Sequence, residues 1–215
     1  RRQRQMCIRD RAWPNPEELL KIISLVRESS RPVIIGGHGI WWSHNEHALA
    51  SAATKLKIPI FNVPYHTKLL GEDCSAMMGL ADFHQYHPSR DAIQEADVIL
   101  MVGCKLDNQM NFGNPPFINK DTKLVCVNGS HEELEYNIGA DIHLLSDPGA
   151  FFNELLKIDH SWDAWFDLQR QRRACREVAL VVGPVVDYVV AGRRLVLGDP
   201  HRHIDSHEDL SLIHI

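Results

Sequence analysis

Three short runs rich in β-branched residues each lead into a glycine, and this recurring pattern constrains the fold most strongly. The runs are residues 32–35, 97–102 and 124–127, and the glycines that follow them are Gly36, Gly103 and Gly129. A short run without polar alternation must be covered on both faces, which in soluble proteins usually means helices on both sides of a parallel sheet. The sequence therefore predicts an α/β domain whose strands end in loops where ligands gather.

Helical patterns separate these runs. Asn15 is suited to cap a helix that ends near Ser29, and Ser43 with Glu46 has the form of a capping box opening a helix through Leu56. Further strands are expected at 58–63 and 141–145, and further helices at 90–95, at 131–134 behind a second capping box of Ser130 and Glu133, and at 148–156 behind Asp147. Because parallel neighbours need right-handed crossovers, this order predicts a doubly wound parallel sheet with helices on both faces, a Rossmann-like fold.

Two segments lack a clear period. Residues 65–87 hold glycine, methionine and histidine without a helical repeat, which favours a functional loop at the sheet edge. Beyond Ile158, the residues Trp162, Trp165 and Phe166 precede a charged run, which indicates a surface segment or linker. Residues 178–197 are valine-rich but interrupted, so they fit either a strand pair or out-of-frame translation, and they are too broken for a membrane span.

Both ends of the chain resemble translated sequencing adapters. Residues 1–10 (RRQRQMCIRD) and 210–215 (LSLIHI) carry this likeness, so we expect an internal gene fragment with neither its native start nor its native stop. The expected organisation is one domain over 11–158, followed over 159–209 by a linker toward a missing C-terminal domain, partly out of frame.

Charge and cysteine content restrict the class of protein. The formal net charge is −5, and it becomes −8 without the four arginines and one aspartate of residues 1–10. An acidic body argues against a nucleic-acid partner, and because no apolar signal segment follows the basic start, we expect a cytoplasmic protein with no membrane partner. The five cysteines show no paired short spacing, which predicts reduced and mostly buried thiols.

The turn Gly36-Gly37-His38-Gly39 is the first candidate binding element. It ends a predicted strand and precedes a predicted helix, where backbone N–H groups could face a pyrophosphate, although a tight turn without a ligand explains it equally well. Nicotinamide chemistry is disfavoured, because Trp42 occupies the third glycine position of the dinucleotide fingerprint and no acid follows the second strand.

Histidine clusters are the second candidate feature. His44 and His47 are expected on one helix face, and His84 and His87 lie near Asp82, but no acid or cysteine completes a ligand set. Solvated or capping histidines are the favoured interpretation, and we predict no metal ligand and no catalytic residue in this chain. Histidines 201, 203 and 207 lie in the segment of doubtful frame and receive no role.

Several motifs together resemble the central domain of thiamine-diphosphate-dependent enzymes, in particular acetolactate synthase large subunits. The likeness covers roughly 14–158 and rests on the order and spacing of RPVIIGGHG at 31–39, KIPI at 57–60, ADVILMVGCKLD at 96–107 and NFG at 111–113. It implies a DHS-like nucleotide-binding fold within an enzyme of acetolactate synthase or 2-hydroxyacyl-CoA lyase type, which makes or breaks a carbon–carbon bond next to a carbonyl.

The resemblance also implies cofactors and partners. Thiamine diphosphate and Mg²⁺ would sit between the flanking N- and C-terminal domains, in a homodimer or homotetramer, so this fragment alone would be inactive. Members of the family hold FAD, ADP or no nucleotide in the central domain, which is why the fold does not fix the ligand. The substrate cannot be read from this part of such an enzyme.

Residue by residue, the resemblance implies one set of nucleotide-binding positions. These are Gly36, Gly37, His38 and Gly39 in the first turn, Gly103, Lys105 and Asp107 after the next run, and Asn128. Lys105 stands where arginine is common, and Asn128 and Ser130 stand where many members carry acids. Leu80-Ala81-Asp82 also departs from the histidine-glycine step of flavin-binding synthases. These departures predict weakened or absent FAD or ADP binding and a structural role for the domain.

Two other functions compete with this interpretation. A stand-alone FAD- or ADP-binding domain without catalysis would need only the glycine turns. An NAD-consuming deacylase on a related sheet would commonly carry a zinc module of paired cysteines, and the cysteine spacing disfavours it.

Overall fold

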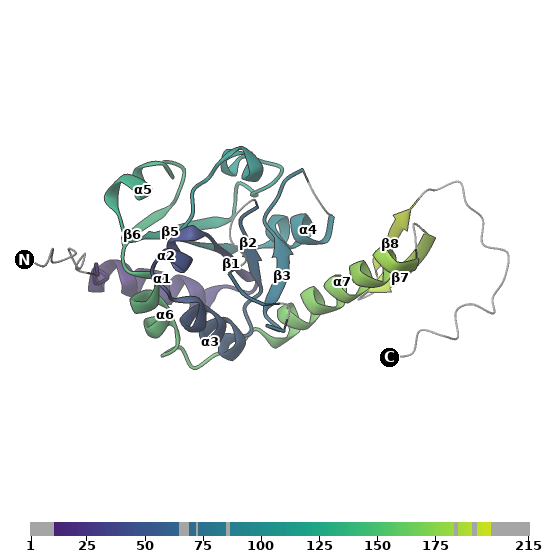
Figure 1. Ribbon diagram of the computed structural model, residues 1–215, viewed down its shortest axis with the longest axis horizontal. Coiled ribbons are helices and arrows are strands. Elements are labelled where there is room, and N and C mark those ends of the chain that lie inside the picture. Colours follow the sequence, from purple (N-terminus) through teal and green to yellow (C-terminus); the bar gives the residue numbers. More distant parts are fainter. Residues whose placement is uncertain are drawn as a thin grey trace, which may run out of the picture. The chain divides into compact units, whose positions relative to one another are not determined.

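A computed structural model describes residues 11–64, 69–71, 73–84, 87–182, 185–190 and 193–198 (Figure 1). Internal contacts divide the chain into two compact units, Arg1–Arg173 and Ala174–Ile215. The first unit contains the sheet that the sequence predicts, and the second contains a strand pair.

The sheet of the first unit has six strands, all parallel, in the order β3-β2-β1-β4-β5-β6. Their bounds are β1 (Pro32–Gly36), β2 (Ile60–Asn62), β3 (Met77–Leu80), β4 (Val98–Val102), β5 (Lys123–Asn128) and β6 (Ile142–Leu145). The chain winds outward from β1 to β3 and then outward in the other direction from β4 to β6. The predicted doubly wound parallel sheet is therefore confirmed, and its central strands β1 and β4 are buried at every residue.

Helices connect and cover these strands. They are α1 (Pro16–Glu28), α2 (His38–Trp42), α3 (Glu46–Leu56), α4 (His87–Glu95), the 3₁₀ helix η1 (Asn108–Gly113), α5 (His131–Glu135), α6 (Pro148–Leu155) and α7 (Asp163–Val182). In Figure 1, α3 and α6 lie together below the sheet and α5 lies above it, and both α5 and α6 contact β5. Helices on both faces explain why the strands are apolar throughout.

Two helix starts follow directly from local chemistry. The Asn15 side chain accepts a hydrogen bond from the N–H of Glu17 at 2.9 Å. The Asp147 carboxylate accepts from the N–H groups of Gly149 and Ala150 at 3.0 and 3.2 Å. Each carboxylate or amide oxygen satisfies donors that a helix leaves unpaired at its start, and each cap is followed by proline.

The two predicted capping boxes are wrong. A short helix, α2, intervenes after β1, and Ser43 directly follows its last residue. The Ser43 hydroxyl donates to the carbonyls of Gly39 and Ile40 within α2. Helix α3 therefore begins later, behind Asn45, and Ser130 likewise makes no side-chain cap to α5. The Ser43 hydroxyl thus bonds to preceding carbonyls and not to a following N–H group. Residue spacing alone does not distinguish these two possibilities.

The segment predicted as a loop at 65–87 contains a strand. Met77–Leu80 forms β3, which pairs in parallel with β2 and makes one edge of the sheet. The strand was missed because it is only partly buried, contains Gly79 at φ +140° and has no β-branched residue. Residues 65–68, 72 and 85–86 lie outside the described part of the chain.

The prediction that the residues after Ile158 form a surface segment or linker is also wrong. Trp162, Trp165 and Phe166 are buried in the core, and the two indole N–H groups donate to the carbonyls of Ser29 and Pro32 at 2.7 and 3.0 Å. These side chains cover the start of the first strand, so the first turn of α7 belongs to the folded domain. The domain boundary proposed at Ile158 stays a prediction.

The second unit contains the antiparallel pair β7 (Val185–Val190) and β8 (Arg193–Gly198), with Val185 opposite Gly198. The strand pair that the valine-rich pattern allowed is thus present. Among the described residues, no helix has the length and apolar content needed to cross a bilayer.

Candidate functional site

The candidate site lies at the carboxyl ends of β1 and β4. The strand order reverses between these neighbours, and in open parallel sheets ligands bind in a crevice at the carboxyl edge beside such a reversal. A cavity of about 690 Å³ lies there. Six of the eight predicted positions line it, namely His38, Gly39, Gly103, Lys105, Asp107 and Asn128.

The glycine turn is required by a close backbone crossing. A Cβ atom on Gly39 would lie 2.6 Å from the Cα of Gly103, and one on Gly37 would lie 2.4 Å from the Cβ of Cys104. Gly103 itself has φ +62°, which disfavours any side chain there. The loops after β1 and β4 therefore pack directly on each other, which explains these glycines without a ligand.

The same crossing uses two N–H groups of the turn that could otherwise face a pyrophosphate. The Gly37 N–H donates to the carbonyl of Val102 at 3.0 Å, and the Gly39 N–H donates to that of Gly103 at 2.9 Å. Gly36 lies within β1, faces the side chains of Leu69 and Ile40, and does not line the crevice. The turn after β1 is consequently hydrogen-bonded to the end of β4.

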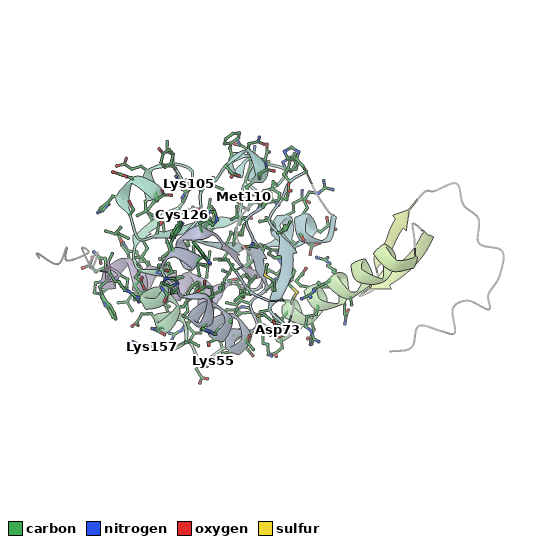
Figure 2. All side chains as sticks on the ribbon, viewed as in Figure 1. Lys55, Asp73, Lys105, Met110, Cys126 and Lys157 are labelled. Carbon is green, nitrogen blue, oxygen red and sulfur yellow. The ribbon has the colours of Figure 1, made fainter. Side chains whose placement is uncertain are left out.

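Lys105 lines the crevice. It lies close to α5 (Figure 2). Its Nζ lies 3.0 Å from Oε1 of Glu133 and 4.2 Å from the centre of the Tyr136 ring. The Lys105 and Glu133 side chains are about two-fifths exposed, at 41% and 39%. Glu133 of α5 and Tyr136, which directly follows that helix, therefore already interact with the ammonium.

A buried asparagine fixes the loop that carries Lys105. Asn137 is 1% exposed; its Oδ1 accepts from the N–H of Leu106 at 2.8 Å and its Nδ2 donates to the carbonyl of Cys104 at 3.2 Å. Asp107 accepts from the N–H of Gln109 at 2.9 Å and starts η1. The loop backbone is thus pinned on both sides of Lys105.

The remaining polar positions are also engaged locally. The Asn128 side chain, predicted to accept from a ribose hydroxyl, accepts from the N–H of Gly129 at 2.9 Å. Sequence reasoning assigned no crevice role to Asp147, whose carboxylate accepts from Asn45 at 3.3 Å and lies 3.9 Å from Nε of Arg11. Asp147 follows β6, so the rule that ligands gather after parallel strands could have identified it.

The thiol that lines the crevice, Cys104, is buried. Burial raises the pKa of Cys104 well above its ordinary value, and the nearby Cys126 and Asp107 raise it further. Burial likewise raises the pKa of Cys126 to about 12. The four described cysteines are unpaired, with Cys104 and Cys126 buried and Cys74 and Cys175 half-buried, and their reduced state stays a prediction.

The prediction that His44 and His47 share a helix face is wrong. His44 has φ +55° and precedes α3, whereas His47 lies inside that helix, so the two do not share a helix face. Within the described residues, no group of three or more His, Cys, Asp or Glu side chains is placed to hold a metal ion. Histidines 201, 203 and 207 lie outside the described part of the chain.

Fold and crevice together define a Rossmann-like α/β domain with a cavity at its topological switch point. The family model for the central domain of thiamine pyrophosphate enzymes matches residues 19–155, and the chain belongs to this family.

Individual relatives support the same assignment. The chain is 27% identical over 143 residues to the acetolactate synthase large subunit of Lactococcus lactis, covering 66% of this chain and 25% of that protein. It is 28% identical over 163 residues to human 2-hydroxyacyl-CoA lyase 1, covering 73% and 27% respectively. It thus spans about a quarter of the length of these curated relatives.

The fold is also found in a solved structure. The crystal structure of benzoylformate decarboxylase from Polynucleobacter necessarius matches with a TM-score of 0.59 and 21% identity, over 70% of this chain and 28% of that one. At this identity the likeness shows the fold alone.

A nucleotide pyrophosphate does not fit the residues present. The N–H groups of Gly37 and Gly39 are already used, and the ammonium of Lys105 faces Glu133. Three carboxylates line the crevice, those of Asp107, Glu133 and Asp147, against the two strong bases Arg11 and Lys105. Because a pyrophosphate carries several negative charges, these acids oppose its binding.

Proposed function

We propose that the protein to which this chain belongs is a thiamine-diphosphate-dependent enzyme that makes or breaks a carbon–carbon bond next to a carbonyl. Membership of the central-domain family supports this proposal, together with relatives named as acetolactate synthase and 2-hydroxyacyl-CoA lyase. Thiamine diphosphate, when bound, supplies the carbanion chemistry. In our proposal the cofactor and Mg²⁺ are held by flanking domains of the same chain, in a cytoplasmic homodimer or homotetramer.

The first test is to sequence the source DNA outward past both ends and to express the complete reading frame. The purified product is then assayed with pyruvate, an oxalyl thioester and a 2-hydroxyacyl thioester, with and without thiamine diphosphate and Mg²⁺. Turnover of one of these substrates that depends on both cofactors would support the proposal. A complete reading frame that encodes only this domain would overturn it and favour the stand-alone binding module.

We further propose that this domain has a structural role and binds ADP or FAD weakly at best. The observation that carries this proposal is the crossing of the β1 and β4 loops, which consumes the N–H groups of Gly37 and Gly39. The domain then contributes a rigid sheet that spaces the flanking domains, and its crevice takes no part in the reaction.

This structural role is tested on the 215-residue chain by titration with ADP and with FAD. We expect dissociation constants in the millimolar range or weaker, and a colourless protein after purification. Binding of either nucleotide with a micromolar constant, about 8 kcal/mol, would contradict the structural role. Such a result would leave the assignment of the parent enzyme intact, because members of one fold differ in their bound nucleotide.

A further inference from the structure

Both strong bases that line the crevice are paired with acids that also line it. Lys105 Nζ lies 3.0 Å from Glu133, and Arg11 Nε lies 3.9 Å from Asp147. The two pairs differ in their surroundings, because Asp147 is also bound by three other donors, whereas Glu133 has Lys105 as its described ion-pair partner. Lys105 and Glu133 therefore form the pair that can be separated without dismantling a helix cap.

Three features hold Lys105 on the α5 side. Glu133 supplies a carboxylate at 3.0 Å, and the Tyr136 ring lies 4.2 Å from the ammonium, within the range of a cation–π contact. Asn137 fixes the backbone on either side of Lys105, so the ammonium can turn toward the crevice only by side-chain rotation.

We propose that Glu133 is the residue that determines which ligands the crevice accepts, because it neutralises Lys105 internally and so rejects phosphate-bearing ligands. This inference rests on the proposed structural role with weak nucleotide binding. In the absence of the Glu133 charge, Lys105 is free to pair with a ligand phosphate, and the crevice binds ADP more tightly.

The expected effect is moderate, because both partners are exposed to solvent. A phosphate that approaches Lys105 must displace the carboxylate and then lie near it, so ligand and Glu133 compete for one cation. Pairs with this degree of exposure contribute little individually, and their release corresponds to about a fivefold change in affinity. Salt screens such interactions over about 10 Å at 0.1 M, so the effect is largest at low ionic strength.

The experiment measures ADP binding to the 215-residue chain by NMR titration at low salt, up to about 10 mM, which resolves dissociation constants in the millimolar range. The variant Glu133→Gln removes the charge and keeps the shape of the side chain. Glu132→Gln is the matched control, because Glu132 lies on the same helix, is exposed and does not line the crevice. Lys105→Met and the double variant complete a double-mutant cycle.

We expect Glu133→Gln to bind ADP about fivefold more tightly than the unmodified chain, with Glu132→Gln nearly unchanged. The gain should vanish in the Lys105→Met background, because Glu133 acts through that ammonium. Equal gains from Glu132→Gln and Glu133→Gln, or a gain that persists without Lys105, would overturn the inference. Micromolar binding by the unmodified chain would instead overturn the structural role, so the two failures are distinguishable. Circular dichroism verifies that each variant is folded.

Discussion

The close approach of two loops requires glycine at three positions, Gly37, Gly39 and Gly103. Each lacks room for a Cβ, since the nearest atoms would lie at 2.4, 2.6 and 2.7 Å respectively. For Gly39 and Gly103 the obstructing atoms belong to backbone, which cannot rotate aside. The glycines that the sequence marked as a binding turn are therefore needed for the fold itself.

Gly39→Ala should destabilise the domain by about 1–3 kcal/mol, because the added methyl group forces the β1 and β4 loops apart. Urea unfolding of the variant and the unmodified chain measures this difference. Gly139→Ala is the matched control, because nothing lies within 4 Å of a Cβ built there. We expect the control to change stability by less than about 0.5 kcal/mol. Equal stability of both variants would contradict the close crossing.

The candidate site was predictable where it follows the apolar strands and not elsewhere. All six predicted residues that line the crevice come at the end of β5 or after β1 or β4, namely His38, Gly39, Gly103, Lys105, Asp107 and Asn128. Arg11 precedes the first helix, and its place opposite Asp147 depends on tertiary packing. The pairing of Lys105 with Glu133 joins a loop to helix α5 and has no signature in local spacing. Whether the six residues contact a ligand stays a prediction.

A buried thiol should make the domain less stable at high pH. Burial raises the pKa of Cys126 from 9.0 to about 12 in the folded chain. Above pH 9 the unfolded chain releases this proton while the folded chain keeps it, so the unfolded state binds fewer protons and stability falls as pH rises. The stability contributed by this group is complete below pH 9 and is lost up to pH 12.

Cys126→Ala isolates this effect from other titrating groups. Between pH 8 and pH 10, the unmodified chain should lose about 1.4 kcal/mol more stability than the variant, as urea unfolding at both pH values would measure. The variant is less stable at every pH because it leaves a cavity, but its loss between the two pH values is smaller. Parallel losses in the two proteins would contradict the predicted titration.

Among the elements, those with strong local signals were predicted well. The helix behind Asn15 and the helix behind Asp147 have their caps as expected, and β1, β4 and β5 are apolar runs in the predicted places. Strand β3 was not predicted, because its place in the sheet depends on pairing with β2 and not on a pattern in its own residues. The burial of the residues at the start of α7 was not predicted, because a charged run follows its three aromatic residues in the sequence. The hydrogen-bond partners of the two tryptophans lie far away in the sequence.

Trp165→Ala tests the role of α7 in the first unit. The change removes a side chain that is 6% exposed and the hydrogen bond from its indole N–H to Pro32, so we expect a loss of about 3–5 kcal/mol. Trp13→Ala is the matched control, because Trp13 is 73% exposed and should cost less than about 0.5 kcal/mol. The denaturant midpoints of both variants give the comparison, and a loss below about 1 kcal/mol for Trp165→Ala would be incompatible with a buried anchor.

At the scale of the whole molecule, three possible boundaries for the domain can be compared. The family model ends at residue 155, and the sequence suggested an end at 158, whereas contacts divide the chain after Arg173. Between these points lie the buried aromatic residues and Arg172, whose guanidinium lies 3.0 Å from the carboxylate of Glu95 on α4. These contacts favour the later boundary for the folded unit.

Two shortened chains discriminate between the boundaries. A chain of residues 11–173 keeps Trp162, Trp165 and Phe166, and we expect its urea midpoint to match that of the full chain, because the contacts of the first unit remain complete. A chain of residues 11–158 loses all three and exposes the core beneath them, which should cost at least about 3 kcal/mol. If both chains unfold at the same midpoint, α7 contributes nothing to the fold and the earlier boundary is right. If 11–173 is itself destabilised, the unit extends beyond Arg173.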